Sequence, residues 1–151
     1  MEKIVVIDDF LTQEECYMYM EFIDREKSGN VQKVYKNVAL VRTFIAKHSE
    51  KLESILLDGV KIKDFHDDVT LSKGMIPLKK HVDSKLHSDK WKLLIYLNNV
   101  ENGGTVFYDG NEEIIIENKA GKAVFFDISL PHASQVYKKQ IKYSIGFRII
   151  T

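Results

Sequence analysis

Short runs of β-forming residues recur from about residue 69 to the end of this chain, and turn signals separate them. Eight such strands after helices favour a jelly roll or another β-barrel with helices packed on one side. We therefore expect a mainly β fold with flanking helices (α+β). The predicted strands are 69–73, 75–83, 91–97, 104–108, 113–117, 122–127, 132–137 and 141–150.

The first part of the chain carries both strand and helix signals. Lys3 to Ile7 predicts a short strand, and Thr12 with Glu15 has the pattern of a capping box, in which the two residues satisfy each other's free backbone donors. A helix is expected from there to about Lys27, with Gly29-Asn30 as its stop signal. The apolar face of this helix would carry Cys16, Met20 and Ile23.

Two more elements are expected before the β-rich part. Val38 to Ala46 is rich in β-branched and aromatic residues and predicts a strand. Ser49 is a candidate cap for a second helix that runs through Leu57.

The charge of the chain is balanced, with 22 Lys plus Arg against 22 Asp plus Glu. A neutral chain has no overall attraction to nucleic acid or to an anionic membrane. Cys16 is its single cysteine, and no run approaches the ~20 apolar residues of a membrane span. We expect one cytoplasmic domain over residues 1–151, with an N-terminal support of strand and helix at 1–68 and the jelly-roll core at 69–151.

The last predicted strand has the clearest pattern, because its residues alternate in polarity. Successive side chains of a strand point to opposite faces, so one face should pack in a core and the other should carry cations and a hydroxyl. That polar face is either solvated or lines a cavity. The apolar positions are Ile141, Tyr143, Ile145, Phe147 and Ile149, and the polar or small ones are Lys142, Ser144, Gly146 and Arg148.

His81 and Asp83 are the first candidates for chemistry. On a strand they would project to one side and converge, while Val82 would point into a core. By itself the pair could be an exposed strand end, so a metal site needs a third ligand. His132, at the start of a later predicted strand, is our candidate; His87 is a weaker alternative in a loop. Two His and one carboxylate form the facial triad of non-haem Fe(II) oxygenases, which leaves three coordination positions open.

An anionic co-substrate would need a cation inside the barrel, and Lys142 lies on the polar face of the last strand. A buried cation needs a partner, which a bound dicarboxylate would provide. Tyr96, on a neighbouring predicted strand, could donate its hydroxyl to the same carboxylate. Arg148 either contacts substrate or pairs with an acid at the barrel end, and Trp91 is either a core residue or a stacking surface for substrate.

Taken in order, these residues resemble the prolyl 4-hydroxylase-like branch of the Fe(II)- and 2-oxoglutarate-dependent dioxygenases. The resemblance covers about residues 69–150. The matching residues are Lys73-Gly74, Leu78, His81-Val-Asp83-Ser84, Leu94-Ile-Tyr-Leu-Asn98, Gly103-Gly104-Thr105, Phe107, Gly121-Lys-Ala-Val-Phe-Phe126, Pro131-His132 and Lys142-Tyr-Ser-Ile145.

The resemblance implies a double-stranded β-helix (jelly-roll) core and a set of roles. The cofactors would be Fe(II), 2-oxoglutarate as co-substrate and O₂, with ascorbate as a candidate reductant. The enzyme would hydroxylate an unactivated C–H of a prolyl residue in a peptide or protein, releasing succinate and CO₂. His81, Asp83 and His132 would ligate iron, Lys142, Tyr96 and Ser144 would bind 2-oxoglutarate, and Arg148 and Trp91 would contact substrate.

Other functions stay open at this point. A hydroxylase of another residue or of a free amino acid fits nearly as well. A nucleic-acid dealkylase of the same superfamily is suggested by the spacing of Lys142 and Arg148, although zero net charge does not support it. A metal-binding barrel without enzyme activity, or a metal-dependent hydrolase or isomerase, would give Lys142 no purpose in binding 2-oxoglutarate.

Overall fold

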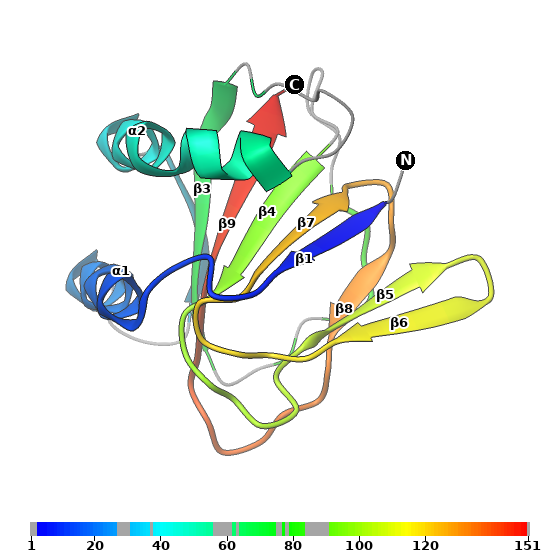
Figure 1. The fold of residues 1–151 in the computed structure, drawn as a ribbon. Coiled ribbons are helices and arrows are strands. Elements are labelled where there is room, and N and C mark those ends of the chain that lie inside the picture. Colours follow the sequence, from blue (N-terminus) through cyan, green and yellow to red (C-terminus); the bar gives the residue numbers. More distant parts are fainter. Residues whose placement is uncertain are drawn as a thin grey trace.

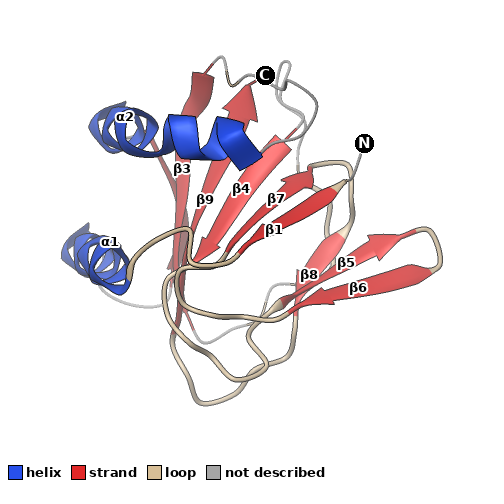
Figure 2. Cartoon of the chain, in the orientation of Figure 1, coloured by secondary structure: helices blue, strands red, loops and turns tan. Residues whose placement is uncertain are grey.

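The computed structural model describes residues 3–26, 31–36, 38–55, 62, 64–74, 77, 79–83 and 91–150. Within these ranges two helices accompany strands that form two sheets (Figures 1 and 2). In chain order the elements are β1 (Ile4–Ile7), α1 (Gln13–Glu26), β2 (Val31–Lys36), α2 (Val38–Ile55), β3 (Asp64–Gly74), β4 (Trp91–Tyr96), β5 (Thr105–Asp109), β6 (Glu112–Ile116), β7 (Ala123–Asp127), β8 (His132–Ser134) and β9 (Lys142–Ile150).

The larger sheet has six strands in the order β1-β7-β4-β9-β3-β2, and the smaller sheet has the order β6-β5-β8. All of these neighbours pair in antiparallel fashion. Both helices lie against one face of the six-stranded sheet, and the three-stranded sheet lies on its other side (Figure 1). This arrangement of two β layers with helices on one side confirms the predicted mainly β, jelly-roll fold class.

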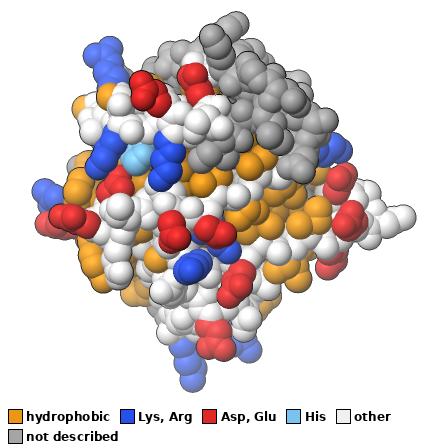
Figure 3. All heavy atoms as spheres, viewed as in Figure 1, with side chains coloured by type: hydrophobic (Ala, Val, Ile, Leu, Met, Phe, Trp, Pro, Cys, Tyr) orange, Lys and Arg blue, Asp and Glu red, His pale blue; other side chains and the backbone are white. Residues whose placement is uncertain are grey.

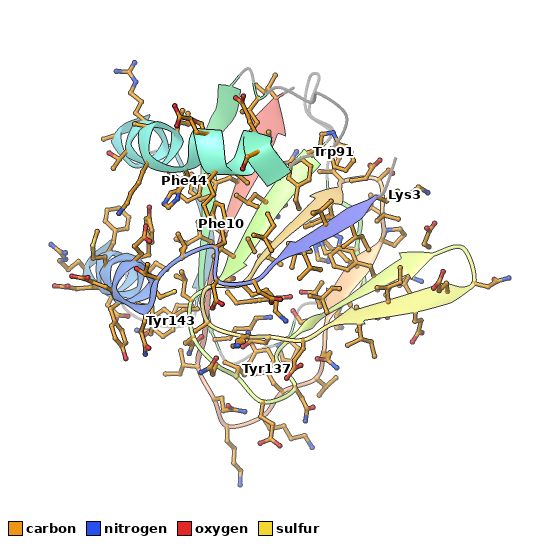
Figure 4. All side chains as sticks on the ribbon, viewed as in Figure 1. Lys3, Phe10, Phe44, Trp91, Tyr137 and Tyr143 are labelled. Carbon is orange, nitrogen blue, oxygen red and sulfur yellow. The ribbon has the colours of Figure 1, made fainter. Side chains whose placement is uncertain are left out.

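Alternation along the central strands divides the core into two parts. The larger part lies between the helices and the six-stranded sheet, where Phe44 of α2 stacks on Phe147 of β9 with ring centroids 4.3 Å apart. Figure 4 shows Phe10 and Phe44 in this layer. The smaller part lies between the two sheets and includes Tyr96, Phe107, Val124, Phe126 and Leu130. Side chains that share a face with Tyr96 therefore point into the space between the sheets.

The start of α1 is the expected capping box. The Thr12 backbone N–H donates to Glu15 Oε1 and the Glu15 backbone N–H donates to Thr12 Oγ1, each at 3.1 Å. The helix ends at Glu26, close to the predicted end at Lys27. The predicted stop signal at residues 29–30 lies outside the described residues.

The strand predicted at Val38 to Ala46 is wrong, because these residues form the first half of α2. Ser49 consequently lies inside the helix and does not cap it. Phe44, His48 and Leu52 recur every four residues and are all buried, which is the pattern of a helix face packed on a core. The packing of this helix face on the core outweighs the β-propensity of the individual residues. The strand β2 was not predicted.

Five strands of the C-terminal half, β4 to β7 and β9, lie within a few residues of their predicted positions. β3 begins at Asp64 instead of residue 69, and β8 ends at Ser134 instead of residue 137. The strand predicted at 75–83 is wrong over residues 79–83, where only an isolated bridge at His81 pairs with another strand.

The N-terminal part does more than support the sheet. β1 and β2 are strands of the six-stranded sheet, and β3 runs across the expected division between residues 68 and 69. Acidic and basic side chains are interspersed over the face shown in Figure 3, as the balanced composition suggests. Among the described residues, no helix is long and apolar enough to cross a membrane.

Candidate metal centre and anion pocket

Three side chains with metal-binding atoms meet at one edge of the smaller sheet. His132 begins β8, and His81 lies beside it in the segment that leads to Asp83. One ligand atom of each of these residues lies within 4.8 Å of the other two. His81 Nε2 is 3.6 Å from Asp83 Oδ1, and His132 Nε2 is 3.7 Å from Asp83 Oδ2.

Backbone hydrogen bonds hold the two histidines together. The His81 N–H donates to the His132 carbonyl and the His132 N–H donates to the His81 carbonyl, both at 2.9 Å. This isolated antiparallel bridge fixes the separation of the two Cα atoms, whatever the side chains do. It also explains why His81 and Asp83 converge although their segment is not a strand of a sheet.

Each imidazole is oriented by a second hydrogen bond. Nδ1 of His81 lies 2.7 Å from the Lys79 carbonyl oxygen, and Nδ1 of His132 lies 3.0 Å from that of Leu130. A carbonyl only accepts, so each Nδ1 carries the proton and each Nε2 keeps its lone pair. Both lone pairs belong to the nitrogens that face Asp83, which is the arrangement of metal-ligating histidines. Burial lowers the pKa of His132 and so favours the neutral form that a metal requires.

The carboxylate supplies an independent test of whether a metal fits here. Asp83 Oδ2 is buried and makes no hydrogen bond, although Lys92 Nζ lies 3.4 Å away without suitable alignment. Buried carboxylate oxygens normally have hydrogen-bond partners, so an oxygen without one has a lone pair that an ion can occupy. Two imidazole nitrogens and one carboxylate suit Fe(II) with open coordination positions. The residues present therefore fit the iron site implied by the sequence.

Val82 corrects one detail of the prediction. Its side chain is 54% exposed and does not enter a core. The alternation argument failed because residues 79–83 do not form a strand and pair with β8 only at His81. His87, the weaker alternative ligand, lies outside the described residues.

A lone cation lies deeper on the same inner face. Lys142 Nζ is 5.2 Å from the ring centroid of Tyr96 and 5.6 Å from that of Tyr137. Burial lowers its pKa to about 8. In the part of the chain that the structure describes, no carboxylate lies within ion-pair distance of this ammonium. Such a cation is suited to an anion that arrives as a ligand.

Hydroxyl groups surround this cation. The Tyr96 hydroxyl lies 2.5 Å from Thr105 Oγ1, and burial raises the pKa of Tyr96 to about 12, so that it stays a neutral donor. Ser144 is buried and lies opposite Tyr96 in the pairing of β4 with β9. The Tyr137 hydroxyl donates to the Gly74 carbonyl at 3.2 Å, which fixes the second ring beside Lys142. Thr105 and Tyr137 thus join the predicted residues in the surroundings of the buried Lys142 side chain.

The two residues predicted to contact substrate lie on opposite faces of the six-stranded sheet. Arg148 lies on the inner face, opposite Lys92 in the pairing of β4 with β9, and its contact with substrate stays a prediction. Trp91 is 3% exposed and stacks on Phe125 in the core beneath the helices, as its label in Figure 4 shows. It lies on the face of β4 opposite to Tyr96. This placement agrees with the alternative that Trp91 is a core residue, and its contact with substrate stays a prediction.

Three residues of the site were missed in the sequence: Lys92, Thr105 and Tyr137. Alternation along β4 puts Lys92 on the same face as Tyr96, so the sequence pattern could have predicted that the Lys92 side chain points inward. The contact of Lys92 with Asp83 could not be predicted, since no local sequence pattern specifies it. The sequence contains no signal that places Tyr137 beside Lys142.

Comparison with known proteins was made at the levels of sequence and structure. No family of known sequences matches the chain, and no curated protein matches it. Solved structures do match over nearly its whole length. The viral collagen prolyl hydroxylase of Paramecium bursaria chlorella virus-1, in complex with 2OG, has a TM-score of 0.71 at 18% identity, covering 98% of this chain and 95% of its own.

Two other structures with similar TM-scores are of different enzymes. The Trichoplax adhaerens prolyl hydroxylase in complex with a hypoxia inducible factor peptide has a TM-score of 0.72 at 14% identity, covering 98% of this chain and 83% of its own. The chain has the fold of the 2OG-Fe(II) oxygenases. The α-ketoglutarate-dependent epimerase SnoN from nogalamycin biosynthesis has a TM-score of 0.71 at 14% identity, covering 99% and 78%. The predicted resemblance to this superfamily and to its prolyl hydroxylases is thus confirmed at the level of the fold.

Proposed function

We propose that this chain is an Fe(II)- and 2-oxoglutarate-dependent dioxygenase that hydroxylates a prolyl residue in a peptide or protein, and that residues 1–151 form its single catalytic domain. The observation that carries the proposal is the joint placement of two sites on one inner face. One is the triad of His81, Asp83 and His132, with both Nε2 lone pairs directed inward. The other is the Lys142 ammonium, which has no carboxylate partner among the described residues.

In this proposal the triad holds Fe(II) through His81 Nε2, His132 Nε2 and an Asp83 oxygen. Bound iron with 2-oxoglutarate and O₂ would supply oxidative decarboxylation: one oxygen atom of O₂ would enter succinate as CO₂ is released, and the other would enter the substrate C–H bond. The chain itself supplies fixed ligand geometry through the His81–His132 bridge and the two carbonyl-oriented rings.

Lys142 pairs with the carboxylate of 2-oxoglutarate that is remote from the metal. The Lys142 amine must be protonated to form this ion pair, and burial makes the ion pair stronger than it would be in water. Tyr96 and Ser144 donate hydroxyl hydrogen bonds to the same carboxylate, with Thr105 holding the Tyr96 hydroxyl in place. The Tyr96 and Tyr137 rings exclude water from around the cation.

The prolyl substrate is supported by two of the similar structures, which are prolyl hydroxylases, one of them with a bound peptide. SnoN shows that the same fold carries an epimerase, so fold alone does not select the substrate. A substrate panel should therefore contain Pro-containing peptides, the same peptides with Pro replaced by Ala, free amino acids and a methylated oligonucleotide. Gain of one oxygen atom by a Pro-containing peptide, detected by mass spectrometry, would support the prolyl assignment.

The class of reaction is tested without any substrate. Anaerobic titration of the chelator-treated protein with Fe(II) and 2-oxoglutarate should produce the visible absorption band of a chelated 2-oxo acid. The band should be absent in His132→Ala and should need more 2-oxoglutarate in Lys142→Ala. Lys122→Ala is the matched control, because Lys122 is also a largely buried lysine but its ammonium pairs with Asp8 and donates to the Glu117 carbonyl. Iron binding with no band in the wild type would contradict the proposal.

A further inference from the structure

Lys92 is the one charged residue of β4, and its alternation with Leu94 and Tyr96 directs it into the space between the sheets. Its Nζ lies 3.4 Å from Asp83 Oδ2. The two side chains are 13% and 9% exposed, so this contact is shielded from water. Neither the resemblance nor the triad argument gave Lys92 any role.

The charge balance at Asp83 makes this contact informative. A buried carboxylate is very costly unless a charge or hydrogen bonds compensate it. Asp83 Oδ2 makes no hydrogen bond, and the ammonium of Lys92 is the nearest basic group recorded for it in the described part of the chain. The two histidines do not supply this charge when they bind a metal, since they are then neutral.

A divalent cation and an ammonium beside the same carboxylate act against each other. Both are attracted to Asp83, and at a separation of a few ångströms they repel one another strongly in a partly buried site. A metal bound between the Nε2 atoms and Asp83 would therefore have to share the carboxylate with Lys92. The distance of 3.4 Å and the poor alignment of Nζ describe an ammonium that holds Asp83 electrostatically without a directed hydrogen bond.

We propose that Lys92 is an internal counter-ion of Asp83 that competes with the metal: it keeps the carboxylate in place when the site is empty and weakens metal binding. Lys92 is thus a positioning residue that makes the metal exchangeable. The inference rests on the metal-ligand assignment in the proposed function, and it does not depend on 2-oxoglutarate or on a substrate.

The test measures binding of Mn(II) alone, followed by electron paramagnetic resonance of the free ion. Mn(II) replaces Fe(II) without oxygen chemistry. Lys92→Met should bind Mn(II) about tenfold more tightly than the wild type, because the repulsion is removed. Lys92→Arg keeps the charge and should stay within about twofold of the wild type. Lys122→Met removes an ammonium of similar exposure, 12%, at a distant ion pair and should change nothing.

A second measurement tests the counter-ion role in chelator-treated protein. Lys92→Met should lower the melting temperature by roughly 5–10 °C, since it leaves a buried carboxylate uncompensated. In a protein that carries Asp83→Asn, the same Lys92 substitution should hardly change the melting temperature. If Lys92→Met does not fold, Lys92→Gln supplies the affinity comparison and the Asp83→Asn double variant supplies the stability comparison.

The outcomes separate this inference from the proposed function. The inference is supported if Lys92→Met binds Mn(II) more tightly and lowers the melting temperature only in the protein that retains Asp83. Mn(II) binding by the wild type with equal or weaker binding by Lys92→Met overturns the competition and leaves the proposed function standing. No Mn(II) binding by the wild type overturns both the metal-ligand assignment and this inference.

Discussion

The Lys142 ammonium is the residue whose ionisation most directly controls the proposed co-substrate site. Burial lowers its pKa to about 8, whereas the neighbouring Tyr96 hydroxyl titrates at about 12. Only the protonated amine pairs with a carboxylate, and a bound carboxylate raises the amine pKa in turn. Ligand affinity is therefore fully present below about pH 8 and is lost as pH rises through that value.

We predict that the dissociation constant of 2-oxoglutarate is nearly constant between about pH 6.5 and 7.5 and rises by about tenfold per unit above about pH 8. In Lys142→Arg this rise should disappear, because a guanidinium stays charged throughout the range. The measurement is the anaerobic band titration at several pH values with Fe(II) saturating. A wild-type affinity that does not change up to about pH 9.5 would show that Lys142 is not the anchor.

At the residue scale the sequence predicted the candidate metal ligands and left out their partners. His81, Asp83 and His132 could be singled out because two histidines and one carboxylate form a facial triad and because their order resembles that of a known family, and the structure brings their side chains together. Lys92 and Tyr137 act through contacts between segments that are distant in sequence, with Asp83 and Lys142 respectively. A contact of that kind depends on strand pairing and loop path, which single-sequence patterns do not specify.

Among the elements, the loop from β6 to β7 contacts the N-terminal segment through the backbone of Gly121. Gly121 has φ of 85° and its carbonyl accepts from the Leu11 N–H at 3.1 Å, while its own N–H donates to Tyr96 O at 2.8 Å. A Cβ at this position would lie 2.4 Å from the Leu11 carbonyl oxygen. Glycine is therefore required here both for its φ and for the close approach.

We predict that Gly121→Ala lowers the free energy of unfolding by roughly 3 kcal/mol or more, measured by urea denaturation. Gly110→Ala is the matched control, since Gly110 also has a positive φ of 62° but has nothing within 4 Å of the position of a Cβ. Gly110→Ala should lower the free energy of unfolding by about 1 kcal/mol, which is the cost of the positive φ alone. Equal costs for the two variants would contradict the importance of the Leu11 contact.

Elements were predicted well where local and tertiary signals agree. The Thr12–Glu15 capping box and the alternation along β9 are each sufficient to identify their element, and both are present as expected. In α2 the signals disagree, since Val and Thr favour a strand while buried residues at a spacing of four favour a helix. The helix forms because its face covers the six-stranded sheet.

At the scale of the whole molecule, a buried polar contact helps to join the two helices. His48 of α2 lies between the rings of Phe10 and Phe44, and its Nε2 is 3.1 Å from Glu15 Oε2 of α1. Burial lowers the pKa of His48, although Glu15 opposes the shift. Burial would raise the pKa of Glu15, but hydrogen bonds from Thr12 and Lys47 outweigh it and leave the pKa lowered.

The signs of these shifts predict acid instability in two stages. A histidine with a lowered pKa in the folded state contributes stability above its usual pKa of 6.5 that is lost as pH falls below it. Glu15 contributes stability above its usual 4.5 that is lost below that value. Burial also lowers the pKa of His132, so His132 contributes to the same pH dependence. The contribution of His48 is therefore measured as the difference between the wild type and a His48 variant.

We predict that His48→Gln reduces the slope of unfolding free energy against pH between about pH 7 and 5.5, where His48 takes up its proton on unfolding. The measurement is urea denaturation at half-unit pH intervals for the wild type and the variant, both treated with chelator. The variant curve should still fall below about pH 4.5, where Glu15 titrates. Parallel curves over the upper range would contradict the role of His48.

The fold class of the whole molecule was predictable because it rests on many short strands and not on any one of them. Errors at α2 and at residues 75–83 did not change the layer architecture. What the patterns could not supply was strand order, including the placement of β1 beside β7 and of β2 beside β3. These pairings are long-range and carry no local signature.

The backbone bridge between His81 and His132 has a consequence for protein engineering. Its two hydrogen bonds involve only main-chain atoms, so exchanging the imidazoles for other donor groups leaves the spacing of the two Cα atoms unchanged. Cysteine, aspartate or glutamate could be introduced at either position without rebuilding the surrounding loops. The scaffold is thus a starting point for artificial metalloenzymes, in which the choice of ligand is independent of the framework that presents it.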